Sequence, residues 1–196
     1  MVWRTRLDVD AYVAKGRELT PPTLVCPSCA APMVLWGWYR RDVRVGEVRR
    51  LWIRRVRCGP CSRSHGVLPE FATHGRLDGV EVIGAAVTAI SEGVGARKVA
   101  EEVGVPHTTV RDWWRRFRSR SRLLVAGFVA AMVAVAGVGP WLASDDASAA
   151  VAAIDGFWVA AVRRWPHRVG SRWRLANVMV GSHVLSTNTD PLWAAG

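Results

Sequence analysis

The sequence has few acidic residues in its C-terminal part and none of the common local catalytic motifs. A nuclease of the transposase type holds magnesium between several carboxylates, whereas the only carboxylates after residue 122 are Asp145, Asp146, Asp155 and Asp190. No Gly-rich phosphate loop or Ser/His/Asp signature is present, and His167 and His183 are isolated. We therefore expect a protein that is not an enzyme.

Lysine and cysteine are scarce, and the N-terminus lacks a signal-like segment. Of the 27 basic residues only Lys15 and Lys98 are lysines, which is typical of a GC-rich genome. The opening segment MVWRTRLDVDAYVAKG has no apolar core of signal-peptide length, so we expect a cytoplasmic protein. In a reducing cytoplasm the four cysteines are not expected to pair as disulfides.

Positive charge is in excess and is concentrated in the first 122 residues. That part holds 22 Lys and Arg against 12 Asp and Glu, a net of +10, whereas residues 123–196 hold 5 against 4, a net of +1. Such a distribution favours a polyanionic partner such as nucleic acid. A solvated basic surface has the same composition, so the charge supports nucleic-acid binding without deciding it.

The four cysteines form two matched C-x2-C pairs, CPSC and CGPC. Each pair places two thiolates on one side of an ion, and two pairs complete the tetrahedron of a closed structural zinc site. Segments 33–39 and 50–57 are rich in β-branched and aromatic residues, which predicts two strands that turn near Gly46. The pattern predicts a zinc ribbon with Zn2+ as structural cofactor, bound by Cys26, Cys29, Cys58 and Cys61.

Three other interpretations of the cysteines stay open. Iron bound by the same sulfurs would make a rubredoxin-like electron carrier. Either C-x2-C could be a redox dithiol, although neither follows a strand and precedes a helix, and four unconnected buried thiols are the last option. His65, four residues after Cys61, is expected to be a strand or turn residue and not a ligand.

A first helix is predicted after the ribbon. Asp78 is expected to be its N-cap, with Glu81 completing a capping box, and Gly93 and Gly95 are expected to end it. Its apolar face comprises Val80, Ile83, Val87 and Ile90.

The segment VAEEVGVPHTTVRDWW, residues 99–114, predicts a helix-turn-helix. The small Ala100 allows two helices to meet closely, and Gly104 accepts the positive φ of a tight turn. A helix over 96–103 and another from His107 to about Arg120 follow from this. The second is expected to bury Val110, Trp113 and Phe117. These offsets match the helix-turn-helix pattern, and an ordinary three-helix bundle with a tight turn is the alternative.

In a helix-turn-helix the exposed face of the second helix lies in the major groove of duplex DNA. The residues expected at base edges are His107, Thr108, Arg111, Asp112 and Arg115, of which Arg115 reaches either a base or a phosphate. The residues expected mainly at phosphates are Arg97, Lys98, Arg116, Arg118, Arg120 and Arg122. Asp112 has an alternative role, since it can pair with Arg116 four residues later.

The hairpin region is rich in arginine and tryptophan. Residues 40–63 contain nine arginines and only two acids, and Trp36, Trp38 and Trp52 lie beside or among them. This composition fits a second nucleic-acid surface or a protein-docking face, and a solvated outer face of the sheet fits it equally.

These motifs together resemble a known group of proteins. RRVRCGPCSRSHGVLP (54–69) followed by GVGARKVAEEVGVPHTTVRDWWRRF (93–117) resembles the N-terminal DNA-binding part of insertion-sequence transposases. The chain resembles more closely short actinobacterial proteins of uncharacterised function that carry ribbon and helix-turn-helix without the nuclease. SRWRLANVMVGSHVLSTNTDP (171–191) is similar to their ending. The resemblance covers most of residues 20–196 and implies DNA binding linked to a mobile element.

Residues 123–139, LLVAGFVAAMVAVAGVG, contain no charged or hydrogen-bonding side chain. A membrane anchor over residues 123–143 is one interpretation, because basic residues precede a long uncharged stretch. A buried helix is the preferred one, since Pro140 is expected to end the helix after about 25 Å, short of the roughly 30 Å hydrocarbon core.

Two more helices are predicted, one from Ser144 as N-cap to about Trp165 and one from Ser171 to Gly181. Their apolar stripes are Val151, Ile154, Trp158, Val162 and Trp165 in the first and Leu175, Val178 and Met179 in the second. Both stripes need a partner, so the apolar helix is expected to be the centre of a C-terminal helical domain that oligomerises.

The expected fold class is α+β, with an N-terminal segment (1–20), a small four-cysteine zinc ribbon (21–75), a helix-turn-helix three-helix unit (76–122) and a C-terminal helical domain (123–196). The expected function is a zinc-stabilised, sequence-specific DNA-binding protein, either a transposon-associated accessory factor or a transcriptional regulator. It would be nucleoid-associated in the cytoplasm, and its partners would be double-stranded DNA and a second copy of the chain or a transposase. The alternative is a membrane-tethered regulatory or partner-recruiting protein anchored by residues 123–143.

Overall fold

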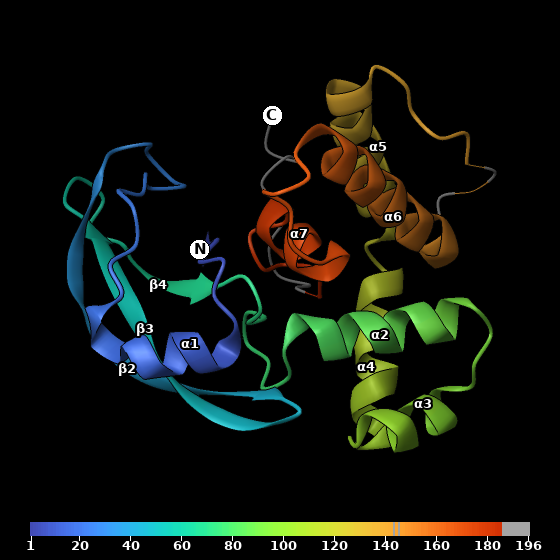
Figure 1. Ribbon diagram of the computed structural model, residues 1–196, viewed down its shortest axis with the longest axis horizontal. Coiled ribbons are helices and arrows are strands. Elements are labelled where there is room, and N and C mark those ends of the chain that lie inside the picture. The colour runs from blue at the N-terminus through green and yellow to red at the C-terminus, as the bar shows by residue number, and fades with distance from the viewer. Residues whose placement is uncertain (143, 145, 186–196) are drawn as a thin grey trace. The chain divides into compact units, whose positions relative to one another are not determined.

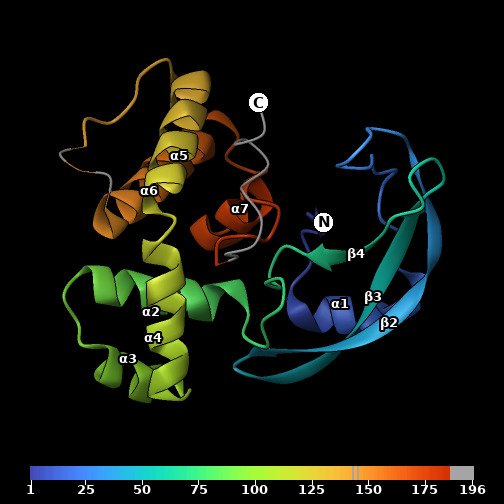
Figure 2. The ribbon, with the colours of Figure 1, turned by 180° about the vertical axis from the view of Figure 1, so that it is seen from behind.

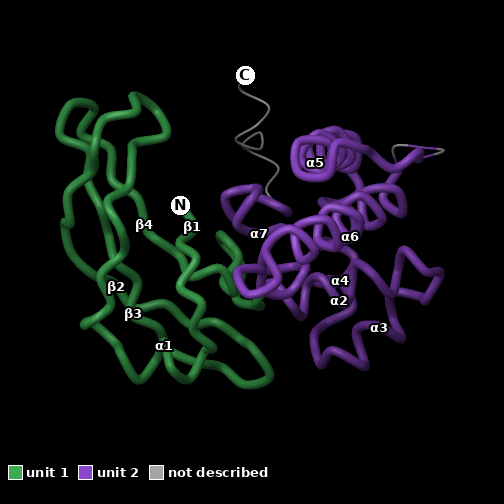
Figure 3. The backbone as a smooth tube through the Cα atoms, turned by 45° about the horizontal axis from the view of Figure 1, so that its top comes forward, with its two compact units in different colours: residues 1–79 green, residues 80–196 purple. Residues whose placement is uncertain are grey.

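The computed structural model describes residues 1–142, 144 and 146–185, and this part of the chain is a mixed α+β structure. It contains a four-stranded sheet and seven α-helices (Figure 1). Two compact units are present, Met1–Gly79 and Val80–Gly196 (Figure 3). This division differs from the four segments that the sequence suggested, because neither the 20/21 nor the 122/123 boundary separates one core from another.

The first unit is built on a sheet of order β1-β4-β3-β2. Strands β2 (Met33–Val45) and β3 (Glu47–Cys58) form a long antiparallel hairpin that turns at Gly46, where φ is 81°. Strand β4 (Ser64–Pro69) pairs antiparallel with β3, and β1 (Val2–Trp3) pairs parallel with β4. Both predicted strands and their turn are confirmed, and His65 is a strand residue as expected.

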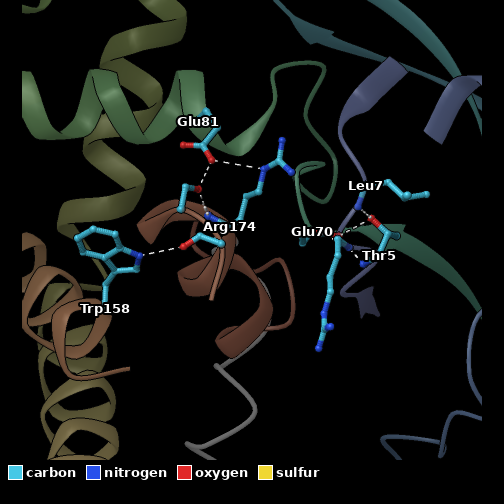
Figure 4. Close-up of polar contacts among 9 residues, drawn as sticks. Thr5, Leu7, Glu70, Glu81, Trp158 and Arg174 are labelled. Atoms are coloured by element: carbon cyan, nitrogen blue, oxygen red, sulfur yellow. Dashed lines mark hydrogen bonds and ion pairs between the residues drawn. The ribbon is translucent and has the colours of Figure 1, made fainter. Parts of the chain in front are cut away.

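The N-terminal segment belongs to this unit and is not separate from it. Helix α1 (Val9–Lys15) buries Tyr12 to 2% exposure, and the Tyr12 hydroxyl donates a 3.0 Å hydrogen bond to the carbonyl of Trp52. The buried carboxylate of Glu70 accepts hydrogen bonds from the backbone N–H and the hydroxyl of Thr5 (Figure 4). These long-range contacts fix residues 1–20 against the sheet, which the local sequence did not indicate.

The second unit is helical, and a single core joins its helices. Phe117 and Trp173, which lie before and after residue 122 in the sequence, are edge to face with ring centroids 6.1 Å apart. The core therefore continues across residue 122. The helices are α2 (Val80–Ser91), α3 (Ala96–Val103), α4 (His107–Arg118), α5 (Ser121–Ala136), α6 (Ala147–Arg164) and α7 (Arg172–Met179).

The start of α2 differs from the prediction. Asp78 is not seen capping the helix, because its buried carboxylate forms a 2.7 Å ion pair with Nε of Arg44 within the first unit. Glu81 does not complete a capping box with it, since its carboxylate accepts a hydrogen bond from the hydroxyl of Ser171 (Figure 4). Both carboxylates make tertiary contacts, which explains why a pattern typical of a helix start does not describe this one.

Helix α5 is not the centre of the second unit, so this expectation is wrong. It buries a single stripe that includes Leu124 and Phe128, whereas Leu123 and Val133 remain 37% and 45% exposed. Helix α6 buries eight residues and contacts α2, α5 and α7. Five of the eight are alanines, whose small side chains let the neighbouring helices approach. The end of α5 is set by Gly137, which is left-handed with φ 73°, and not by Pro140.

The predicted N-cap is confirmed for α7 and wrong for α6. Ser171 caps α7 as expected, but Asp146 and not Ser144 caps α6. The expected stripes are partly wrong, because Trp173 is buried in α7 and Trp165 of the α6 stripe is 39% exposed. Asp145, Asp190 and the end of the family-like segment, residues 186–191, lie outside the described residues.

No single helix among the described residues is long and apolar enough to cross a membrane. Helices α4 and α5 reach the required length and composition only as a pair, and the two are bent by 60° at the break between them.

Candidate functional site

The four cysteines come together at the end of the β2–β3 hairpin that lies opposite Gly46 in the strand register. Each cysteine offers one sulfur, and the four Sγ atoms lie within 4.8 Å of one another. The closest pairs join the two motifs, with Cys26 Sγ 3.5 Å from Cys61 Sγ and Cys29 Sγ 3.4 Å from Cys58 Sγ. The two C-x2-C pairs thus interlock as the spacing predicted.

The two cysteine turns have the same backbone conformation. The residue after the second cysteine is left-handed in both, with φ 56° at Ala30 and at Ser62. In both, the N–H of the first cysteine donates a 2.8 Å hydrogen bond to the carbonyl two residues after the second. Neither left-handed residue was singled out from the sequence, although its place directly after a C-x2-C is a local signal.

The cluster is suited to one metal ion. A tetrahedral ion with metal–sulfur bonds of about 2.3 Å has its sulfurs about 3.8 Å apart, which lies within the observed range of separations. The pKa values of two thiols shift in opposite directions: that of Cys26 is lowered to about 6, chiefly by a hydrogen bond from the backbone at Ser28, and that of Cys58 is raised by burial and by hydrogen bonds with the other sulfurs, so Cys26 ionises before Cys58. Cys26 and Cys58 are buried beside Met33, Val56 and Val67, so apolar side chains cover part of the cluster.

A second candidate site lies on α4. Helices α3 and α4 are joined by residues 104–106, and Gly104 caps α3 in the left-handed conformation with φ 68° and ψ 35°. Helix α3 has the predicted bounds, while α4 ends at Arg118 and not near Arg120. Both α3 and α4 contact α2, and Figure 2 shows α2 crossing α4 while α3 lies beside its first turns.

The expected buried face of α4 is confirmed. Val110, Trp113 and Phe117 are at most 1% exposed, and Ala100 of α3 is buried at 4%. The small side chain of Ala100 and the positive φ of Gly104 let the two helices meet through a three-residue turn. One face of α4 is therefore fixed in the core, which leaves the opposite face free.

That opposite face carries most of the predicted DNA-contacting side chains. Thr108, Arg111, Arg115 and Arg118 are exposed, and with Asp112 and Trp114 they line a shallow hollow along the helix. His107 is half-buried. Arg97 and Lys98 are exposed in the first turn of α3, and Arg122 is exposed in α5.

Asp112 and Arg120 lie differently from the simplest expectation. The carboxylate of Asp112 pairs with Nε of Arg116 at 2.7 Å and also with the guanidinium of Arg115, so the alternative of a helical ion pair is the one observed. Arg120 is only 5% exposed at the junction of α4 and α5. Its expected phosphate contact is therefore wrong, because the bend between the helices turns it into the protein.

Comparison with family models gives a match to part of the chain. A family described as a domain of unknown function, DUF6431, matches residues 26–113. The chain is similar to that family from the first cysteine to Trp113, a span that includes both cysteine pairs, the hairpin, α2, α3 and the first part of α4. No curated protein and no solved structure matches the chain.

Proposed function

We propose that this protein binds double-stranded DNA in a sequence-specific manner through α4, and that a structural zinc ion held by the four cysteines stabilises the first unit. The observation that carries the proposal is the two-sided character of α4. One face is fixed by Val110, Trp113 and Phe117. The other exposes Thr108, Arg111 and Arg115 along one hollow.

The α3–turn–α4 element is proposed to act as a helix-turn-helix. Three features support this: the buried Ala100, the left-handed Gly104 and the burial of Val110 and Trp113. In such an element the first turns of the second helix reach the base edges. Thr108 and Arg111 lie in the first turns of α4. Arg97 and Lys98, exposed in the first turn of α3, are placed to meet phosphates, which set the position of the protein and not its sequence preference.

The ion pairs of Asp112 give that residue a positioning role in the proposal. Its carboxylate contacts both Arg115 and Arg116 and so limits the rotamers that these long side chains sample. A guanidinium held in place loses less conformational entropy when it binds a guanine or a phosphate. Asp112 is thus proposed to orient the arginines and not to read a base itself.

Zinc is the proposed metal because four thiolates in two interlocked pairs leave no open coordination position. The ion would join the β3 end of the hairpin to the segment before β2. One of the two small buried clusters of the first unit is built around these cysteines, so the ion would add to a small core. Iron in the same sulfurs would colour the purified protein, whereas zinc is colourless, so the visible spectrum and the metal content separate the two.

The proposal is tested with the full chain and labelled DNA duplexes selected for binding from a random pool. The double variant Arg111→Ala plus Arg115→Ala is expected to raise Kd at least about tenfold and to reduce the salt dependence of binding by about two released ions. Arg163→Ala plus Arg164→Ala, two exposed arginines at the end of α6, is the matched control for charge.

Far-UV circular dichroism and the urea midpoint establish that both variants are folded. If the α4 variant binds the selected duplex as tightly as the control, α4 is not the recognition helix. If selection enriches no sequence, binding is not sequence-specific. A transposon-associated accessory factor and a transcriptional regulator both fit the proposal, and the position of the enriched sequence, at a transposon end or at a promoter, distinguishes them.

A further inference from the structure

Helix α5 is covered on one side, by α6, which lies alongside it (Figure 2). The ring centroids of Phe128 in α5 and Phe157 in α6 are 5.7 Å apart. A Cβ added to Gly156 of α6 would lie 3.1 Å from Sδ of Met132, so the two helices are in close contact there. The opposite side of α5 exposes four apolar residues, which we call the outer stripe: Leu123, Ala126, Ala130 and Val133.

The spacing of the outer stripe is that of a seam between two helices. Its members follow one another at intervals of three, four and three residues, which keeps them in one line along the helix. The two alanines lie in the middle and the larger Leu123 and Val133 at the ends. A second helix can therefore approach closely at the centre of the stripe and contact larger side chains at both ends.

The segment after α5 continues this apolar surface. Gly139 lies beside the outer stripe, since a Cβ added to it would be 3.0 Å from a methyl group of Val133. Val138 and Trp141, on either side of this contact in the sequence, are 68% and 87% exposed. The whole segment 123–142 has no charged residue. A strongly acidic or basic partner would therefore gain no ion pair from this surface, whereas an uncharged apolar one matches it.

A second copy of the chain presents such a surface. A twofold interface uses the same patch on both subunits, and an uncharged stripe of this spacing is complementary to itself. Two helices of 16 residues, packed along their length, bury on the order of 1,000 Å² in total, the lower limit of a stable interface. A lipid surface fits less well, because a helix that lies on a membrane has a polar face rich in Lys and Arg, whereas Arg122 is the one charged residue of α5.

We propose that the outer stripe of α5 is a homodimer interface, in which the stripes of two copies pack against each other. The interface has a consequence for DNA that rests on the function proposed above for α4. Helix α4 ends at Arg118 and α5 begins at Ser121, so a dimer formed through α5 sets the distance between its two α4 helices. The target is then two inverted half-sites separated by a whole number of helical turns.

The test is the mass of the full chain in solution, measured by sedimentation equilibrium over a range of concentrations. We expect about twice the 21.5 kDa of one chain. Ala126→Glu plus Ala130→Glu should raise the dimer dissociation constant at least about a hundredfold, because association would bury unpaired carboxylates. The matched control is Ala85→Glu plus Ala152→Glu, at exposed alanines of α2 and α6, which adds the same charge and should remain dimeric. Far-UV circular dichroism establishes that both variants are folded.

A variant without added charge supports the same test. Leu123→Ala removes apolar area from one end of the outer stripe and is expected to weaken association about fivefold or more. A chain that stays monomeric at about 100 μM would overturn the proposal, and so would equal dissociation constants for the two glutamate variants. Binding to vesicles of phosphatidylethanolamine and phosphatidylglycerol that Ala126→Glu plus Ala130→Glu abolishes and the control keeps would assign the stripe to a lipid surface and overturn it as well.

Duplex binding separates this proposal from the one on α4. Arg111→Ala plus Arg115→Ala is expected to remain dimeric while losing the duplex. Ala126→Glu plus Ala130→Glu is expected to bind a single half-site as the control does and the inverted repeat at least about tenfold more weakly. A dimer that binds no duplex would contradict the function of α4 and support the interface, whereas a monomer that binds a half-site would contradict the interface alone.

Discussion

Gly84 of α2 lies directly against the indole of Trp173 of α7, so closely that a Cβ added to Gly84 would overlap the ring. The same indole, 3% exposed, lies edge to face with Phe117 of α4. Glu81, one turn before Gly84, accepts a hydrogen bond from Ser171 and lies 3.5 Å from Nε of Arg174 (Figure 4). The helices before and after residue 122 are thus held together by a contact that only glycine admits.

Gly84→Ala is therefore expected to destabilise the second unit. Alanine favours a helix by up to about 1 kcal/mol over glycine, but the overlap with Trp173 forces the two helices apart at a cost of about 1–3 kcal/mol or more. We expect a net loss in the free energy of unfolding, measured by urea denaturation. Ala85→Ser on the exposed side of α2 is the control, expected to change that free energy by about 0.5 kcal/mol. A Gly84→Ala variant more stable than the unaltered chain would contradict the contact.

Replacing the left-handed residues of the cysteine turns by glycine is expected to stabilise the first unit. Ala30 and Ser62 have φ 56°, a conformation that costs a residue with a Cβ roughly 1–2 kcal/mol, whereas glycine loses about 0.5–1 kcal/mol through the entropy of its unfolded chain. Ala30→Gly and Ser62→Gly should each gain up to about 1 kcal/mol in thermal or urea unfolding. Ala31→Gly, whose φ is not positive, should lose stability instead.

Loss of one cysteine is expected to unfold the first unit and leave the second intact. Cys58 is fully buried, and its sulfur would be one of four ligands, so Cys58→Ser should abolish stoichiometric metal binding. Hydrogen exchange measured by mass spectrometry should rise sharply in peptides from residues 26–69 and stay low in those from 80–185, whose core contains no residue of the first unit. Val25→Ala, at an exposed neighbour of Cys26, should change neither metal content nor exchange.

Asp112→Asn tests whether this carboxylate orients arginines or reads a base. Removing the negative charge frees Arg115 and Arg116 and raises the positive charge of α4 by one. We expect tighter binding to non-specific duplexes, a salt dependence steeper by about one ion, and a loss of about 0.5 kcal/mol in helix stability. Discrimination between the selected duplex and a scrambled one should fall only modestly. A selective loss of affinity for duplexes with one particular cytosine would instead mark Asp112 as a base-reading residue.

Features determined by nearby residues were predictable from the sequence. The bounds of α3 follow from Gly104, which ends the helix in a left-handed cap, and from Pro106 before α4. The pairing of the cysteines follows from the C-x2-C spacing and a hairpin that turns at Gly46. In each case one or two residues impose the local backbone, so no knowledge of distant partners is needed.

Features determined by distant partners were not predictable in the same way. Asp78 and Glu81 have the spacing of a capping box, but Arg44 and Ser171 bind them. The apolar composition of α5 suggested burial on all sides, yet composition does not tell which side a neighbour covers. The stacking of Arg54 on Trp38 appeared only as a bias in composition, because the strand register decides which indole meets which guanidinium.

The contact between Gly84 and Trp173 also bears on how the chain is made. The two residues are 89 positions apart, since 173 − 84 = 89, so a ribosome adding about 5–20 residues per second needs about 4–18 seconds to supply the indole after the glycine. During that interval the side of α2 that Trp173 covers in the folded protein stays uncovered on the nascent polypeptide. A chaperone that shields apolar surface could bind α2 during that time, before α7 emerges.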